Sequence, residues 1–148
     1  VRPKEVYDGA IPSGNSVSAY NFIRLGRILS RHDYEDIGFD IIDAFSSKLN
    51  RYASGSTMLL HALDFIEGPS FEVIVIGEKK KSQQLLSFIQ KHQQPNKVII
   101  YSETPNKIFD FLSIYPSGEK NNPLVYVCQN YSCKLPTDDL SKIDQMLK

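Results

Sequence analysis

The sequence predicts a mixed α/β chain in which a three-helix region is followed by a small lobe of three parallel strands, in the order β-α-β-α-β-α. Before residue 68, apolar residues recur at the three- and four-residue spacing of α-helices. After residue 69, short β-branched runs alternate with capped helical segments, a pattern typical of strands joined through helices. We therefore divide the chain into residues 1–68 and residues 69–148, with the joint at Gly68-Pro69-Ser70.

Three helical segments account for the first region. We expect one helix over residues 14–30, apolar around most of its circumference, and a second over residues 34–53 with a single apolar stripe. Gly55 stops the second helix and Ser56 is placed to cap the third. Because only two other helices can cover the first one, we expect the chain to expose apolar surface and to associate with itself or with a partner.

Three apolar runs are the predicted strands of the second region: residues 71–76, 98–101 and 124–128. Helical segments lie between and after them, and Ser82, Thr104 and Thr137 are placed to cap these segments. Strands joined through helices pair in parallel with right-handed crossovers, so we expect all three strands to be parallel.

The charge balance and the hydropathy pattern exclude several classes of function. The 148 residues carry 17 basic and 17 acidic side chains, so the chain lacks the positive field that non-specific binding to nucleic acid or anionic lipid requires. No apolar run approaches the roughly 20 residues that span a bilayer, and we recognise no secretory signal. We therefore expect no nucleic-acid or membrane partner and a cytoplasmic location. Because helical periodicity begins soon after Val1, we also expect the chain to be part of a longer protein.

The densest group of polar residues, segment 8–16, lies directly before the first helix. In one interpretation, Asp8 is a catalytic acid/base or hydroxyl-binding carboxylate, and Ser13 and Asn15 bind a polar ligand at the helix N-terminus. In the other, Ser13 or Asn15 only caps the helix and the glycines form a tight turn. If the segment faces a cleft, we expect a ligand, a basic neighbour or a function in the larger protein to hold the Asp8 carboxylate, because the helix begins several residues later. In the capping interpretation, Asp8 lies at an exposed turn.

Cys128 and Cys133 are the only cysteines, and they flank the end of the third predicted strand with C-x4-C spacing. Thioredoxin-like redox sites use C-x-x-C, and a four-ligand zinc site cannot be assembled from two cysteines without a nearby histidine. We expect free structural thiols, with a reversible, redox-active disulfide as the alternative. The sequence predicts neither a metal site nor a cofactor.

Three motifs, at residues 8–16, 60–64 and 127–136, resemble segments of the family of proteins related to spermatogenesis-associated protein 20. D-G-A-I-P-S-G-N-S at residues 8–16 resembles the family's D-G-A-x-P-S-G-N-S segment. V-C-Q-N-Y-S-C-K-L-P at residues 127–136 resembles its closing V-C-x4-C-x-x-P, and L-H-A-L-D at residues 60–64, followed by Gly68-Pro69, resembles the passage between them. The resemblance covers essentially the whole chain.

The resemblance implies the C-terminal part of a longer protein, in which a thioredoxin-like domain precedes an (α/α) toroid similar to those of N-acylglucosamine epimerases and six-hairpin glycosidases. The three helices would end this toroid, and the α/β lobe would be an appendage. Carbohydrate binding or processing in the intact protein is one function implied by this analogy. A non-catalytic interaction or regulatory region, docking the thioredoxin-like domain or another subunit, is the alternative. In either case we expect the upstream domains to be partners and the isolated chain to be inactive.

Overall fold

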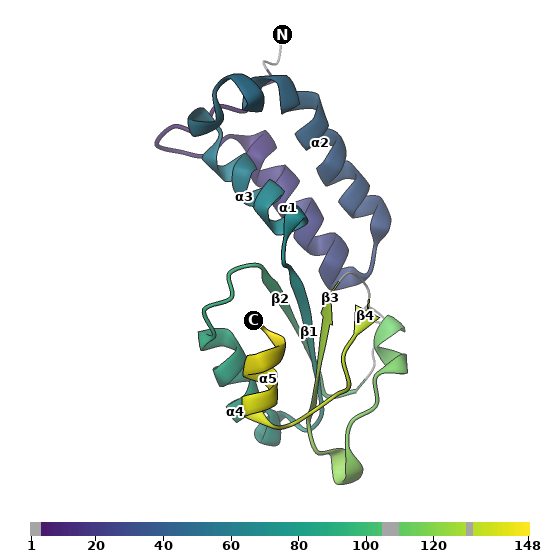
Figure 1. Cartoon of the computed structure of the whole chain (residues 1–148). Helices are drawn as coiled ribbons and strands as arrows, with labels where there is room; N and C mark the ends of the chain where they lie inside the picture. Colours follow the sequence, from purple (N-terminus) through teal and green to yellow (C-terminus); the bar gives the residue numbers. More distant parts are fainter. Residues whose placement is uncertain (1–3, 105–109, 130–131) are drawn as a thin grey trace. The chain divides into compact units, whose positions relative to one another are not determined.

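The computed structural model describes residues 4–104, 110–129 and 132–148. It confirms the mixed α/β class, with helices and a four-stranded sheet (Figure 1). The chain divides into two compact units, Val1–Pro69 and Ser70–Lys148, a division one residue later than the boundary drawn from the sequence. No helix in the described part of the chain is long and apolar enough to cross a bilayer.

Three helices form the first unit: α1 (Gly14–Leu29), α2 (His32–Arg51) and α3 (Thr57–Glu67). A short 3-10 turn, η1 (Ala53–Gly55), separates α2 from α3. The three predicted helices are therefore confirmed, and the ends of the first two lie within two residues of the predicted ends.

Two glycines allow α1 and α2 to lie side by side at close range (Figure 1). A Cβ atom at Gly26 of α1 would lie 2.4 Å from Cγ of Glu35, and one at Gly38 of α2 would lie 2.5 Å from Cγ1 of Ile23. Both distances are far shorter than a van der Waals contact, so a side chain at either position would force the helices apart. Ile23, which contacts Gly38, is fully buried.

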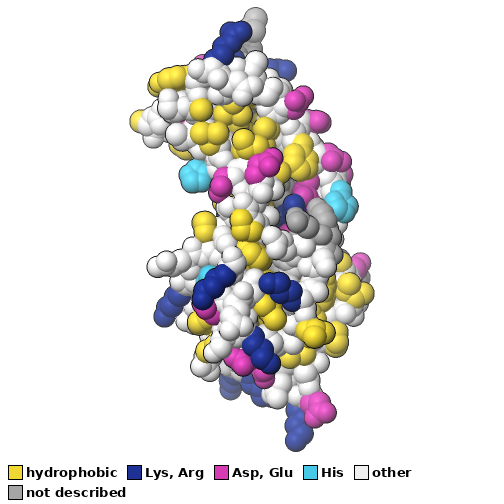
Figure 2. Space-filling view, in the orientation of Figure 1, with side chains coloured by type: hydrophobic (Ala, Val, Ile, Leu, Met, Phe, Trp, Pro, Cys, Tyr) yellow, Lys and Arg dark blue, Asp and Glu magenta, His cyan; other side chains and the backbone are white. Residues whose placement is uncertain are grey.

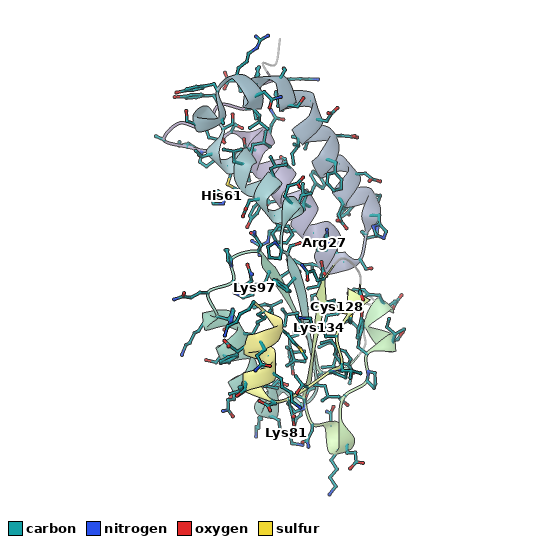
Figure 3. All side chains as sticks on the ribbon, in the orientation of Figure 1. Arg27, His61, Lys81, Lys97, Cys128 and Lys134 are labelled. Carbon is teal, nitrogen blue, oxygen red and sulfur yellow. A yellow bond between two sulfur atoms is a disulfide. The ribbon has the colours of Figure 1, made fainter. Side chains whose placement is uncertain are left out.

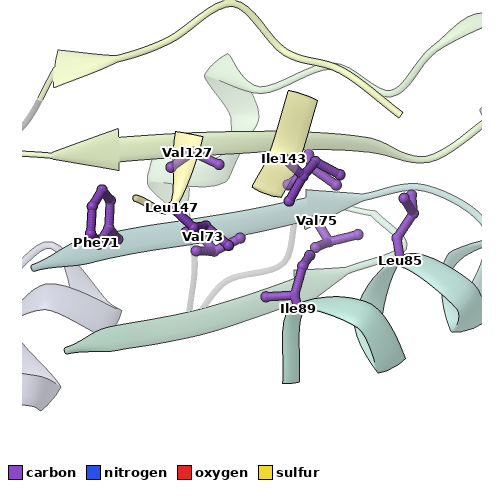
Figure 4. Packing of buried hydrophobic residues seen from close by; sticks show 9 residues of the cluster. Phe71, Val73, Val75, Leu85, Ile89, Val127, Ile143 and Leu147 are labelled. Carbon is purple, nitrogen blue, oxygen red and sulfur yellow. The ribbon is translucent and has the colours of Figure 1, made fainter. Parts of the chain in front are cut away.

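The second unit is a sheet with the strand order β2-β1-β3-β4. Its strands are β1 (Phe71–Ile76), β2 (Lys97–Ser102), β3 (Leu124–Gln129) and β4 (Ser132–Cys133). Helices α4 (Lys79–Lys91) and α5 (Leu140–Met146) cover one face of the sheet (Figure 1). An apolar cluster lies between them and the strands (Figure 4) and contains Phe71, Val73, Val75, Leu85, Ile89, Val125, Val127, Ile143 and Leu147.

The prediction of three parallel strands is wrong for the third strand. β1 and β2 are parallel and are joined through α4, as expected, but β3 pairs antiparallel with β1. Leu124, the first residue of β3, pairs with Ile76, the last residue of β1, so the chain enters β3 at the end of the sheet where β1 and β2 finish. A chain that does not cross back to the other end can only continue in the opposite direction.

The connection from β2 to β3 explains this reversal. Its described part contains two 3-10 turns, η2 (Asp110–Ile114) and η3 (Glu119–Asn121), in place of a crossover helix. The helix start predicted at Thr104-Pro105 leads into residues 105–109, which lie outside the described residues.

The helix caps predicted at Ser82 and Thr137 are wrong. α4 begins at Lys79, so Ser82 lies inside its first turn. α5 is capped by Asp139, whose carboxylate accepts N–H groups from the helix's first turn. Thr137 instead pairs with Val125 in an isolated β-bridge. A sequence motif alone could not distinguish these serine, threonine and aspartate positions, since each of the three side chains can act as a cap.

Candidate functional site

Three backbone N–H groups hold the Asp8 carboxylate in place. Its Oδ1 accepts the N–H of Ser13 at 2.7 Å, while Oδ2 accepts the N–H groups of Met58 at 2.8 Å and Leu59 at 3.3 Å. Met58 and Leu59 lie in the first turn of α3, so Asp8 caps this helix from a distant part of the chain. The groups that hold Asp8 within this chain are therefore the N–H of Ser13 and the N-terminus of α3. Asp8 is 9% exposed, so the expectation of an exposed turn is corrected, while a ligand contact of Asp8 stays a prediction.

These contacts determine the protonation state of Asp8. Burial raises the pKa of the carboxyl group, but hydrogen bonds from Ser13, Ser16, Met58 and Leu59 outweigh burial and hold the pKa below its ordinary value. Asp8 is therefore an anion at neutral pH, with both oxygens engaged. A general base needs a lone pair directed at a substrate, and the observed contacts are all internal. A catalytic role for Asp8 stays a prediction.

Ser13 caps α1, as the capping interpretation expected. Its hydroxyl accepts the N–H of Ser16 at 3.1 Å. Asn15 has another role, because its Nδ2 donates to the carbonyl oxygen of Glu5 at 2.5 Å and fastens the preceding segment to α1. Ser56 directly precedes α3, but its side chain makes no cap hydrogen bond, so Asp8 supplies the cap that the sequence assigned to Ser56. Ligand binding by Ser13 and Asn15 stays a prediction.

A groove of about 920 Å³ opens between the start of α1 and the middle of α2. Ser13 and Asn15 line it, whereas Asp8 is not among its described lining residues. α2 contributes the carboxylate of Asp40 and an apolar wall of Ile37, Ile41, Ala44 and Phe45. Of the three site residues predicted in segment 8–16, Ser13 and Asn15 therefore line one groove, and Asp8 lies outside its described lining.

Sequence reasoning missed the contribution of α2 to this groove. Ile37, Ile41 and Phe45 form the stripe that identified the helix, but periodicity alone could not show that part of the stripe remains uncovered. Ile37 is 40% exposed in the structure, whereas Phe45, at the other end of the stripe, is only 7% exposed. Figure 2 shows hydrophobic side chains gathered on the visible face of the helical unit.

The groove can hold two kinds of occupant. Its apolar wall suits a helix with an apolar face, while the hydroxyl, amide and carboxylate groups of Ser18, Asn15 and Asp40 suit a ligand rich in hydroxyl groups. Within the described residues, no three His, Cys, Asp or Glu side chains come together to hold a metal ion.

Cys128 and Cys133 form a disulfide, so the prediction of free thiols is wrong. They are directly opposite each other in the ladder between β3 and β4. The sequence did not predict β4, and the antiparallel return of the chain at this strand places the two cysteines face to face. A redox role for the pair stays a prediction.

Fold and site together define a two-unit α/β chain whose helical unit carries an open, partly apolar groove. The chain is similar over 99% of its length to Spermatogenesis-associated protein 20 of Homo sapiens and of Rattus norvegicus, with 29% identity to each. An uncharacterized protein of Caenorhabditis elegans is 22% identical over the same share of the chain. The resemblance inferred from the three sequence motifs is therefore confirmed.

The chain spans about a fifth of the length of these relatives, 19–20% in each case. No family model matches it. No solved structure matches it at a significant level.

Proposed function

We propose that the chain is the C-terminal part of a longer relative of Spermatogenesis-associated protein 20 and serves there as a non-catalytic docking region. In this proposal the helical unit ends an (α/α) toroid, and the preceding helix of the same protein occupies the groove between α1 and α2. A thioredoxin-like domain further upstream and a cytoplasmic location belong to the same proposal. The length of the relatives supports it, because about four fifths of such a protein would lie outside this chain.

The uncovered side of α2 is the observation that carries this proposal. An amphipathic helix placed in the groove would cover Ile37, which is 40% exposed, and the half-buried Ile41, and burial of apolar surface contributes about 25 cal/mol per Å². The charged residues Lys4, Glu5 and Asp40 also line the groove, where they can pair with the polar flanks of such a helix.

The contacts of Asp8 also favour a non-catalytic role. Its oxygens are directed to backbone N–H groups of Ser13, Met58 and Leu59, and its side chain is 9% exposed. A carboxylate used in this way organises the entry into α1 and the start of α3.

Sedimentation velocity tests the docking proposal. We expect the 148-residue chain to associate with itself as its concentration rises, and Ile37→Asp to weaken that association. Ile11→Asp is the matched control, because Ile11 is 82% exposed and does not line the groove. Restoring the upstream helices should also weaken self-association, since they would occupy the same surface. A tight monomer at all concentrations, or equal effects of the two substitutions, would contradict the proposal.

A carbohydrate is the second candidate occupant of the groove in the intact protein. The polar side chains of Ser18, Asn15 and Asp40 line the groove together with the exposed side chain of Ile37 and favour it, because sugars combine hydroxyl groups with apolar ring faces. A thermal-shift screen of the full-length protein against mono- and oligosaccharides tests this candidate. A sugar that raises the midpoint should lose its effect in Asp40→Asn and keep it in Asp36→Asn, a change at an exposed position outside the groove.

A further inference from the structure

We propose that the Cys128–Cys133 disulfide is a thiol–disulfide exchange site, opened reversibly by an external dithiol that attacks Sγ of Cys133. The two cysteines are placed unequally in the sheet. Cys133 lies on β4, the two-residue edge strand, and is exposed. Cys128, labelled in Figure 3, lies on β3, and its exposed fraction is 3%. The proposal does not depend on the helical unit or its groove.

The unequal exposure determines which sulfur reacts. Exchange requires a thiolate to reach one sulfur of the bond, and exposed disulfides are the ones that exchange readily. The burial of Cys128, which is 3% exposed, restricts the approach to its sulfur, while Cys133 is exposed on the edge strand. Cys133 is therefore the electrophilic sulfur and Cys128 the leaving group.

The reaction balances in two steps. In the first, the dithiol's thiolate forms a bond with Sγ of Cys133, and the electron pair of the broken disulfide goes to Sγ of Cys128, which takes up a proton. In the second step, the free sulfur of the dithiol attacks the dithiol sulfur that is bound to Cys133. The two dithiol sulfurs form a disulfide, and Cys133 is released as a thiol. The protein gains two electrons and two protons, and the dithiol becomes a disulfide. A small disulfide such as oxidised glutathione reverses the change.

Opening the bond releases the edge of the sheet. Among the described residues, β4 pairs with β3 at two positions, and one of these is the cysteine pair itself. Beyond it, the N–H of Lys134 donates to the carbonyl oxygen of Val127 at 3.0 Å. Once the covalent link is gone, so short a ladder is free to open, whereas β1 keeps both its neighbours. The consequence of reduction is a loosened edge on an intact sheet.

The test is carried out on the native chain with dithiothreitol, followed by alkylation and mass spectrometry. We expect the reduction rate to rise in proportion to the dithiol concentration without denaturant. With glutathione we expect the adduct on Cys133, located by tandem mass spectrometry. A rate that levels off as dithiol rises would mean that reduction waits for unfolding, and an adduct on Cys128 would reverse the assignment. Either result would overturn the proposal.

Two single variants test the asymmetry independently. In Cys128→Ser the remaining thiol at Cys133 should react with iodoacetamide at least about tenfold faster than the thiol that remains in Cys133→Ser. Equal rates would overturn the proposal. If either variant fails to fold, amide exchange of the wild-type chain decides: reduction should accelerate exchange at Lys134 and leave β1 unchanged. Unchanged exchange at Lys134, or equal acceleration throughout the sheet, would overturn the loosened edge.

Discussion

At the scale of single residues, Asp8 connects its own segment, ahead of α1, with the start of α1 and the start of α3. Its oxygens accept N–H groups from Ser13, at the entry to α1, and from Met58 and Leu59, at the start of α3. A carboxylate at a helix N-terminus satisfies free N–H groups and interacts favourably with the helix dipole. A single side chain thus fixes the path of the chain ahead of α1 against a helix about 50 residues away.

We expect Asp8→Asn to destabilise the chain by about 1–2 kcal/mol, because an amide offers one acceptor oxygen and no charge. Urea unfolding followed by circular dichroism measures the change, since the chain contains no tryptophan. Asp36→Asn is the matched control at an exposed position of α2 and should change stability by less than about 0.5 kcal/mol. Equal stability of both variants and wild type would show that the Asp8 cap contributes nothing.

The contribution of Asp8 should depend on pH. Its folded-state pKa lies below the ordinary value, so its stabilising effect is fully present above the unfolded-state pKa of about 3.9 and is lost as pH falls through the folded-state pKa. The stability difference between wild type and Asp8→Asn should therefore be constant from pH 7 to about pH 5 and shrink below pH 4. A difference that grows on acidification would contradict the low pKa.

At the scale of elements, the pairing of α1 with α2 depends on positions without side chains. Gly26 faces Glu35, and Gly38 faces Ile23. Glu35 also pairs with Arg27, its Oε2 lying 2.8 Å from Nε of Arg27, so a shift of Glu35 would disturb this ion pair as well.

We expect Gly38→Ala to cost about 1–3 kcal/mol, because the new Cβ would displace Ile23 from the buried contact. Gly14→Ala is the matched control: nothing lies within 4 Å of a Cβ at this position, and Gly14 is the first residue of α1. Since alanine favours the helix, the control should be neutral or stabilising by up to about 1 kcal/mol. Equal thermal midpoints for the two variants would contradict close packing at Gly38.

At the scale of the whole molecule, each unit has its own core. Leu59 and Phe65 are buried in the helical unit, while the apolar cluster around Val73, Ile89 and Ile143 belongs to the α/β unit. A unit with its own core can fold alone.

We therefore expect Ser70–Lys148, expressed alone with its disulfide intact, to unfold in one cooperative transition in urea. Val73→Ala should lower its midpoint, because removing two methyl groups from a fully buried site leaves a cavity. A broad, non-cooperative loss of the circular dichroism signal in the wild-type fragment would mean that the α/β unit needs the helical unit to fold.

The amino-acid sequence alone determined the elements whose signals are local. The periodicity of α1 and α2 and the β-branched runs of β1, β2 and β3 depend on residues within one turn or one strand of each other. The sequence placed the cap of α1 at Ser13 or Asn15, and the structure assigns it to Ser13. The resemblance to Spermatogenesis-associated protein 20 also came from contiguous motifs.

The tertiary structure decided what depends on residues far apart in the chain. Asp8 caps a helix beyond the reach of any local motif, and the direction of β3 follows from the end of the sheet at which its connection arrives. The disulfide formed because β4 turns Cys133 back onto Cys128, and the groove exists because Ile37, on the α2 stripe, stays exposed among the residues that the structure describes. These outcomes are set by which segments pack together, and a local pattern of residues carries no information about that choice.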